Sequence, residues 1–136
     1  YQLGLVDRVT LCGAQPPALI RDEMLRADVF LHAAVSEGFG NAVMEAQSMM
    51  LPVVCTDADG LRENVSDGES GLVVPRRDPR ALADAMARLA PEPALRQRMG
   101  ESGRKRVLVK FRLADQIAAF GALYERVLAA PPARRP

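Results

Sequence analysis

The sequence predicts an α/β fold built on a parallel sheet, and three observations lead to this prediction. Short apolar runs rich in β-branched residues alternate with segments of helical spacing as far as Pro75. Glycine or proline marks the ends of these runs. From Asp78 onward only helical patterns follow. The 136 residues, of which 49% are apolar, allow one domain with a core of its own.

The first elements are predicted between Arg8 and His32. Arg8–Cys12 is β-branched and apolar, which is typical of a strand, and Gly13 ends it. Pro16-Pro17 suits the first turn of a helix, and apolar residues follow at helical spacing as far as Ala27. Asp28–His32 is a nearly continuous apolar run, as in a parallel strand that is covered on both faces. We expect His32 at its end to have a backbone partner rather than a ligand.

The middle of the chain predicts two further strands and two helical segments. Asn41–Met50 contains no proline and no glycine, so a helix can run there. Leu51–Thr56 is predicted as a buried strand, with Pro52 tolerable at its start, and Leu61–Val65 as a short helical turn. Gly71–Val74 is predicted as the last strand, since turn residues precede it and proline closes it.

Helices are predicted over the rest of the chain. Asp78-Pro79 is an N-cap residue followed by proline, which is a strong helix start. The predicted helices are Arg80–Ala90, Glu92–Lys110 and Leu113–Ala129. The second of these is either continuous or broken at Gly100 or Gly103. The last of them has apolar residues spaced for packing, at Ile117, Phe120, Leu123, Tyr124 and Leu128. Residues 131–136 predict a disordered tail.

Composition excludes several classes of function. A net charge of +1 gives no strong pull toward nucleic acid, and 4% aromatic residues without tryptophan give no base-stacking platform. No apolar run approaches the ~18 residues of a membrane span, and no signal peptide is found. Cys12 and Cys55 are expected to be buried free thiols in a reducing compartment, with a disulfide as the alternative. A lone His32 makes no metal site.

Basic residues gather on the late helices, where they form either a solvated helix face or a contact with anionic lipid. They are Arg96, Arg98, Arg104, Lys105, Arg106 and Lys110.

The chemistry is expected between Val35 and Cys55. Glu37 and Glu45 are separated by seven residues, and Gly38 and Gly40 let the backbone between them turn sharply and approach a ligand. The first turn of the following helix leaves backbone N–H groups that point back at the loop, and phosphate is the usual guest of such an end. The stretch therefore predicts a phosphate cradle with a carboxylate on either side.

A second pair of carboxylates, Asp57-x-Asp59, follows the strand Leu51–Thr56. Two carboxylates in a loop can hold a divalent metal on a diphosphate. Aspartate is also common beside turns, and we expect Asp59 to shape the loop rather than to bind a metal.

An ordered series of short motifs runs through residues 3–129. The motifs are Ala27-Asp28-Val29-Phe30, Glu37-Gly38-Phe39-Gly40 with Glu45, Leu51-Pro52-Val53-Val54, Gly60-Leu61 with Glu63-Asn64-Val65, Asp67-Gly68 with Gly71-Leu72-Val73-Val74-Pro75, and Asp78-Pro79 with Ala81-Leu82-Ala83. Together they resemble the C-terminal, donor-binding domain of the retaining GT-B glycosyltransferases of family 4. The resemblance implies a Rossmann-like sheet with helices on both faces, as one part of a GT-B fold.

The resemblance also implies a role for each residue of the site. Glu37 would be the catalytic residue that holds a donor-sugar hydroxyl and faces the reacting carbon. Backbone donors would come from Gly38, Phe39 and Gly40 to the sugar, and from Asn41 and Ala42 to the diphosphate. Glu45 would accept both ribose hydroxyls. Gly13, Ala14 and Gln15 would lie by the base.

The implied reaction is glycosyl transfer from a UDP- or GDP-sugar, with retention at the anomeric carbon. No cofactor and no metal are expected. The acceptor, a glycan or a lipid-linked glycan, would bind an N-terminal domain that this chain lacks. We expect a cytoplasmic location, with the inner face of the membrane as the place of any peripheral contact. The sequence does not indicate the base, the sugar, the acceptor or the oligomeric state.

The chain departs from the family pattern at several positions. The family often has Pro-Ser where Ala33-Ala34 stand, and it usually has glycine at the positions of Met50 and Asp59 and proline at that of Arg62. The Arg62 change lies near the loop that would bind the donor, and it is expected either to alter which sugar fits or to mark a subfamily.

The resemblance also implies that the first two strands of the domain, and a loop whose Arg and Lys neutralise the diphosphate, are absent. Those strands would lie between Arg8–Cys12 and Asp28–His32, so the sheet has a gap unless these two segments pair directly or a second chain fills it. We expect residues 1–130 to form a partial nucleotide-sugar-binding domain that has no transferase activity alone.

The sequence is also compatible with two other kinds of function. The first is a GT-B-fold epimerase or phosphorylase, which would need catalytic histidines or a pyridoxal-phosphate lysine. The only lysines are Lys105 and Lys110, both in the late helices. The second is a non-catalytic sugar-nucleotide-binding or interaction module.

Overall fold

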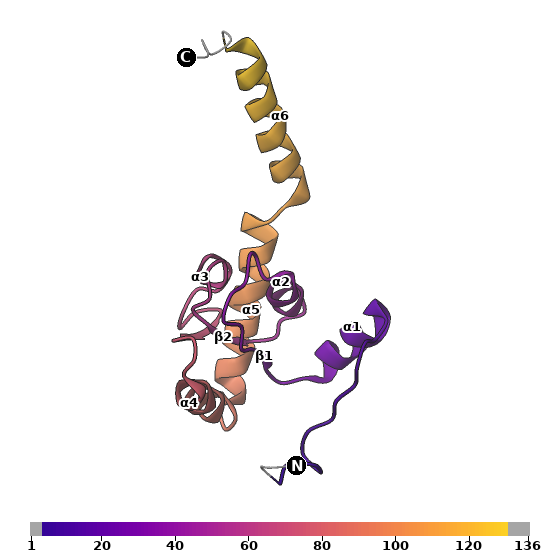
Figure 1. Cartoon of the computed structure of the whole chain (residues 1–136), viewed down its shortest axis with the longest axis vertical. Coiled ribbons are helices and arrows are strands. Elements are labelled where there is room, and N and C mark those ends of the chain that lie inside the picture. The colour runs from indigo at the N-terminus through magenta and orange to yellow at the C-terminus, as the bar shows by residue number, and fades with distance from the viewer. Residues whose placement is uncertain (1–3, 131–136) are drawn as a thin grey trace.

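The computed structural model describes residues 4–130, in which helices cover a three-stranded parallel sheet (Figure 1). The elements are α1 (Pro17–Arg26), β1 (Phe30–His32), α2 (Asn41–Ser48), β2 (Val53–Thr56), α3 (Leu61–Asn64), β3 (Gly71–Val74), α4 (Pro79–Leu89), α5 (Pro93–Lys110) and α6 (Leu113–Ala129). Four of the helices, α2 to α5, cover the sheet. The predicted α/β fold with a parallel sheet and a helical C-terminus is confirmed. The predicted tail, residues 131–136, lies outside the described residues.

Strand β2 is the centre of the sheet and is buried along its whole length. Its register pairs Val53 with Phe30 of β1 and with Gly71 of β3. Because side chains alternate across a strand, β2 supplies both halves of the core. Val53 and Cys55 pack on one face with residues of α2 and α3. Val54 packs on the other face with residues of α4 and α5.

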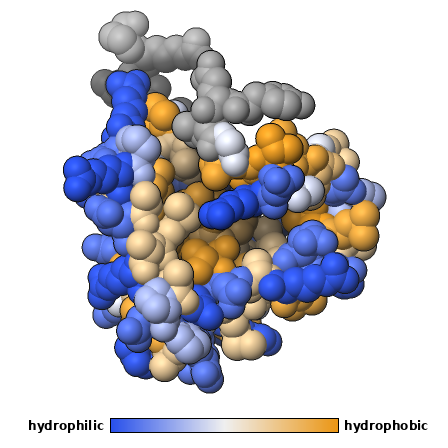
Figure 2. Space-filling view, turned by 90° about the horizontal axis from the view of Figure 1, so that it is seen from below, coloured by the Kyte–Doolittle hydropathy of each residue, from blue (hydrophilic) through white to orange (hydrophobic). Residues whose placement is uncertain are grey.

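The segment Arg8–Cys12 is not a strand, so the prediction of a fourth strand was wrong. It pairs with no strand of the described chain, and Val9 and Leu11 are 54% and 92% exposed. Strand β1 is also less covered than expected, since Leu31 is 43% exposed. A β-branched run becomes a strand only when a neighbour accepts its hydrogen bonds and covers its side chains. Figure 2, which shows the molecule from below, has hydrophobic residues exposed between hydrophilic ones on this side.

The two cysteines differ in their surroundings. Cys55 lies in β2 and is buried, and this burial, with a smaller contribution from the charge of Asp67, raises the pKa of its thiol to about 12. Cys12 is exposed, so the expectation that it is buried was wrong, for the same reason that its strand is absent. Both are free thiols, as expected.

Helix α6 projects away from the rest of the molecule (Figure 1). None of its residues is buried, although its apolar residues are spaced as on a packed helix. The expected packing of α6 is therefore not made within the described residues. The exposed fractions are 63% for Ile117, 52% for Phe120, 41% for Leu123, 64% for Tyr124 and 84% for Leu128.

Helix α5 is continuous through Gly100 and Gly103, so the alternative with a break is wrong. Both glycines lie where α5 crosses α2 and the chain that follows it. A Cβ at Gly100 would collide with the carbonyl of Met50, whose carbon would be 2.7 Å away. A Cβ at Gly103 would lie 3.0 Å from Cγ of Gln47. The glycines are thus needed for close packing of two helices.

The ends of β2 and β3 are joined by Asp57. Its backbone N–H donates to the Val74 carbonyl at 2.8 Å, and its Oδ1 accepts from the backbone N–H of Arg76 at 2.8 Å. The Arg62 and Arg76 guanidinium groups approach its carboxylate at 2.8 and 3.3 Å. The Arg62 hydrogen bond, followed by the Arg76 backbone, lowers the pKa of Asp57 from 3.8 to about 2.

We predict that Gly100→Ala lowers the free energy of unfolding by about 2 kcal/mol or more, because the new methyl group meets rigid backbone. The matched control is Gly121→Ala on α6, where a Cβ meets nothing within 4 Å. It should be neutral or stabilising by up to about 1 kcal/mol. Urea unfolding of both variants measures the difference. Equal stability of the two would contradict the packing described for Gly100.

We also predict that Asp57 makes stability depend on pH in the acid range. Its pKa is lowered in the folded chain, so its contribution is complete above about pH 4 and is lost as the pH falls toward 2. Asp57→Asn should therefore be less stable than wild type at pH 7, with the difference shrinking between pH 4 and 2. Urea unfolding at several pH values measures this. Asp84→Asn, on α4, controls for removal of a surface carboxylate.

Candidate functional site

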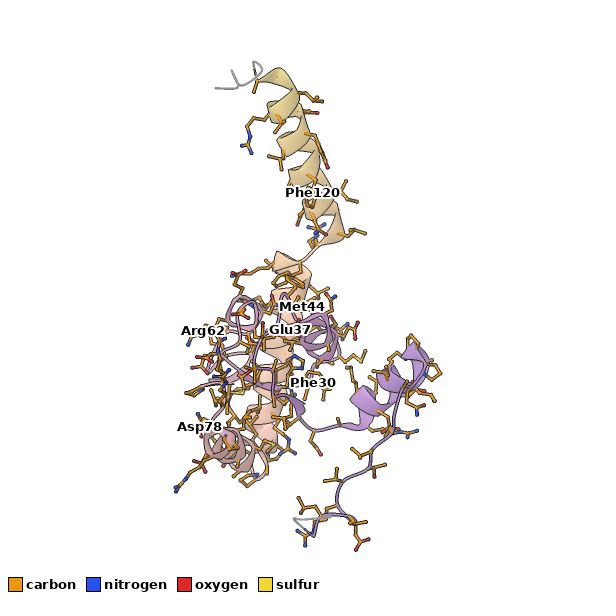
Figure 3. The ribbon with its side chains drawn as sticks, viewed as in Figure 1. Phe30, Glu37, Met44, Arg62, Asp78 and Phe120 are labelled. Carbon is orange, nitrogen blue, oxygen red and sulfur yellow. The ribbon has the colours of Figure 1, made fainter. Side chains whose placement is uncertain are left out.

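The candidate site lies at the edge of the sheet where the parallel strands end. Residues 33–40 lead from β1 to α2, and residues 57–60 lead from β2 to α3. Carboxyl ends of parallel strands share one edge, and ligands bind there in open α/β sheets. Figure 3 shows Glu37 between α2, which carries Met44, and α3, which carries Arg62. We call residues 35–40 the donor loop.

Gly40 sets the geometry of the donor loop. Its backbone is left-handed, with φ +81°, and α2 begins at the next residue. A Cβ at Gly40 would lie 2.6 Å from Cδ2 of Leu61, so position and backbone both require glycine. No side chain caps α2. The N–H groups of its first turn, including those of Asn41 and Ala42, have no partner within the helix and are available to an anion.

Glu37 is held at both carboxylate oxygens. Oε1 accepts from the backbone N–H of Gly40 at 3.2 Å, and Oε2 lies 3.2 Å from Nε2 of His32. The His32 hydrogen bond is the main cause of a lowered pKa, so Glu37 is a carboxylate at neutral pH. His32 thus has a side-chain partner, and the expectation of a backbone partner was wrong. This contact could not be predicted from the sequence, because neither residue type implies the other.

Glu45 lies on the exposed side of α2, one turn after Asn41. Residues four apart on a helix share a face and are about 6 Å apart along its axis. The side chains of Asn41 and Glu45 are both exposed. A ligand that meets the first turn of α2 can therefore extend along the helix to Glu45.

Buried polar groups hold the donor loop through hydrogen bonds, and they were not predicted as site residues from the sequence. Nδ2 of Asn64 donates to the carbonyl of Phe39. The Asn64 carbonyl accepts from Nε2 of Gln47 at 3.1 Å and from Nε of Arg106 at 3.0 Å. Asn64 and Gln47 are fully buried. The loop conformation therefore depends on α2, α3 and α5 together.

A cavity of about 620 Å³ opens on one side of the donor loop. Phe39 and Asn41 line it, together with Lys110 and Arg112 at the junction of α5 and α6. The ring of Phe39 meets that of Phe111 edge-on, with 5.9 Å between their centroids. Glu37 and Glu45 are not among its lining residues.

The residues predicted to lie by the base, Gly13, Ala14 and Gln15, form the exposed loop before α1. Gly13 is left-handed, with φ +63°, and Nε2 of Gln15 donates to the Cys12 carbonyl. Figure 1 shows α1 and the segment before it set apart from α2 and α3. The structure does not bring this loop to the donor loop, and its role stays a prediction.

The carboxylates of Asp57 and Asp59 are both engaged by other protein groups and do not form a shared metal site. Asp57 is paired with Arg62 and Arg76, and Asp59 accepts hydrogen bonds from the donor loop. In the part of the chain that the structure describes, no three His, Cys, Asp or Glu side chains are grouped as metal ligands. Among the described residues, no helix has the length and apolar character needed to cross a membrane.

Comparisons with known proteins show the family of this chain. The family model described as Glycosyl transferases group 1 matches residues 1–106. The lipopolysaccharide core biosynthesis mannosyltransferase LpcC of Rhizobium leguminosarum bv. viciae is 34% identical over 125 residues, which are 92% of this chain and 35% of that protein.

Solved structures are similar as well. Sucrose-phosphate synthase from Thermosynechococcus elongatus matches with a TM-score of 0.85 and 33% identity, over 93% of this chain and 32% of that one. HepE from Anabaena, in complex with UDP, matches with a TM-score of 0.81 and 25% identity, over 89% and 34%. The chain thus spans about a third of each of these proteins. It belongs to the glycosyl transferases group 1 family and has the fold of part of a GT-B glycosyltransferase.

Proposed function

We propose that this chain binds the nucleotide-diphosphate sugar of a glycosyltransferase, and that the complete protein transfers the sugar with retention of anomeric configuration. The observation that carries the proposal is the uncapped start of α2, which follows the left-handed Gly40 directly and has the Glu37 carboxylate beside it. HepE, whose fold the chain shares, was solved in complex with UDP and with UDP-glucose. A UDP- or GDP-sugar is therefore the proposed donor.

The diphosphate would lie against the first turn of α2. There the N–H groups of Asn41 and Ala42 and the positive end of the helix stabilise the negative charge that develops on the leaving group. The backbone of Gly38, Phe39 and Gly40 would meet the sugar. One turn further along α2, Glu45 would accept the ribose hydroxyls. In this arrangement Glu37 and Glu45 bind opposite ends of the donor, the sugar and the ribose.

Glu37 would act on the donor sugar as a carboxylate. Its hydrogen bonds with His32 and Gly40 hold it ionised and in one orientation. In that state it accepts a hydrogen bond from a sugar hydroxyl and stabilises positive charge that develops at the anomeric carbon. We propose that no metal takes part, since Asp57 and Asp59 already accept hydrogen bonds from arginines and from the donor loop.

The remaining parts of the proposal concern the complete protein. Its acceptor would be a glycan or a lipid-linked glycan held by a further domain, as suits a relative named for lipopolysaccharide core biosynthesis. The enzyme would work in the cytoplasm at the inner face of the membrane. The Gly13–Gln15 loop would contact the nucleotide base.

Calorimetric titration of the chain with UDP, UDP-glucose, GDP and GDP-mannose tests the donor site. We predict binding to one nucleotide and its sugar, weakened about tenfold or more in Glu45→Ala. A carboxylate that accepts hydrogen bonds contributes about 1.5–3 kcal/mol, and about 1.4 kcal/mol is tenfold in affinity. Asp84→Ala, which removes an exposed carboxylate from α4, should bind as wild type does.

Two results would refute the proposal. One is a folded wild-type chain that binds none of the four ligands, which would favour a non-catalytic interaction module. The other is binding that Glu45→Ala leaves unchanged.

A further inference from the structure

Arg76 links the loops that follow all three strands. It stands two residues after β3, and its Nε and Nη2 bind the Asp57 side chain and carbonyl at 3.3 and 2.9 Å. Its Nη1 donates to the Val35 carbonyl in the donor loop at 3.2 Å and lies 3.5 Å from Oδ1 of Asp59. One guanidinium group, carried by the segment after β3, therefore contacts the loops that follow β1 and β2 at once, which its five donors and planar fork allow.

Asp59 holds the donor loop from the same side. Its Oδ2 accepts from Oγ of Ser36 at 2.9 Å and from the backbone N–H of Glu37 at 3.3 Å. These bonds, of which the one from Ser36 is the largest cause, lower the pKa of Asp59, so its carboxylate is charged at neutral pH. The next residue adds a backbone bond, because the N–H of Gly60 donates to the Glu37 carbonyl at 3.2 Å.

The backbone of Asp59 is strained in support of these contacts. Its φ is +28°, in the region that side chains other than those of asparagine and aspartate rarely adopt. Such strain persists only where surrounding contacts maintain it, which is often at functional sites. The contacts that maintain it here are those to Ser36, Glu37 and Arg76. A glycine at this position would remove both the strain and the contacts.

We propose that Asp59 and Arg76 are positioning residues that clamp Val35, Ser36 and Glu37 of the donor loop, so that Glu37 faces the donor sugar. Between them they bind the Val35 carbonyl, the Ser36 hydroxyl and the Glu37 N–H. The loop has glycine at Gly38 and Gly40, and without the clamp its backbone has freedom to move. The inference rests on the proposed function, because it assigns the clamp to the sugar-binding end of the site.

The position of the clamp decides which part of the donor it affects. It holds the loop before Gly38, whereas Asn41 and Glu45, proposed for the diphosphate and the ribose, belong to α2. Loss of the clamp should therefore lower the contribution of the sugar to the binding affinity and leave the contribution of the nucleotide unchanged. A residue with only a structural role would weaken both together.

The first experiment compares affinities for UDP-glucose and UDP, or for GDP-mannose and GDP, whichever pair wild type binds. In Asp59→Gly and Arg76→Gln, the preference for the sugar nucleotide should fall about three- to tenfold, the cost of ordering one or two flexible groups on binding. Affinity for the free nucleotide should not change. Asp59→Asn, which tolerates the same backbone and keeps an acceptor for Ser36, should retain part of the preference.

Two controls separate positioning from folding. Arg77→Gln changes the neighbouring arginine, which is exposed and takes no part in the contacts to Val35, Asp57 and Asp59 described above, and should keep the wild-type preference. Asp59→Gly should keep a cooperative unfolding transition in urea, because glycine adopts the positive φ of this position without the contacts that maintain it in aspartate.

A second experiment follows amide hydrogen exchange in the ligand-free chain. Exchange of the Glu37 and Gly60 amides should become faster in Asp59→Gly, while amides of β2 stay as slow as in wild type. Unchanged exchange at Glu37 would overturn the inference, as would variants that keep the wild-type preference for the sugar nucleotide. A wild-type chain that binds none of the four ligands would instead refute the proposed function, and the inference with it.

Discussion

The left-handed turn at Gly40 is the constraint on which the rest of the site depends. It lets the chain leave the end of β1 and start α2 without an intervening cap, and Leu61 packs where a side chain at Gly40 would stand. The same residue offers its N–H to Glu37, so the turn also orients the carboxylate. Helix start, loop and acid are thus fixed by one backbone conformation, which only glycine adopts at low cost.

Charge is arranged around this turn in an orderly way. Arginines from α3 and from the segment after β3 neutralise Asp57, and Asp59 turns its charge toward N–H and O–H donors of the donor loop. The formal charge of the whole chain is only +1, so these pairs, and not the net charge, determine the electrostatics at this edge of the sheet. Charged groups held by several hydrogen bonds in fixed geometry act as preorganised dipoles, and such dipoles lose little by reorganising when a ligand arrives.

Local signals predicted most of the fold. Asp78-Pro79 marked the start of α4, and Asp78 caps Ala81 as expected. The bounds of β3 and α6 also agree with the sequence. Arg8–Cys12 has the same local character as β3 but no strand beside it, and sequence alone does not say which neighbours a strand finds. The packing expected of α6 was wrong for the same reason, since no described element covers its apolar residues.

The site was predictable where a residue acts through its own type and spacing, and unpredictable where it acts through a distant partner. The glycines of the donor loop and the start of α2 belong to the first kind. The support by Asn64 and the contact of Arg76 with Val35 span 25 and 41 residues and belong to the second. Met50 and Asp59 stand where the resemblance led us to expect glycine, and both have a positive φ, which glycine adopts at lower cost than other residues.

His32 has a practical consequence for work in solution. It is the only imidazole in the chain, and its ring rests against the carboxylate of Glu37. Its ring protons therefore give a resonance that needs no assignment, placed at the centre of the site. Any molecule that draws Glu37 away from that ring will move this one signal, so a plain proton spectrum can register occupancy of the loop without a label or a coupled assay.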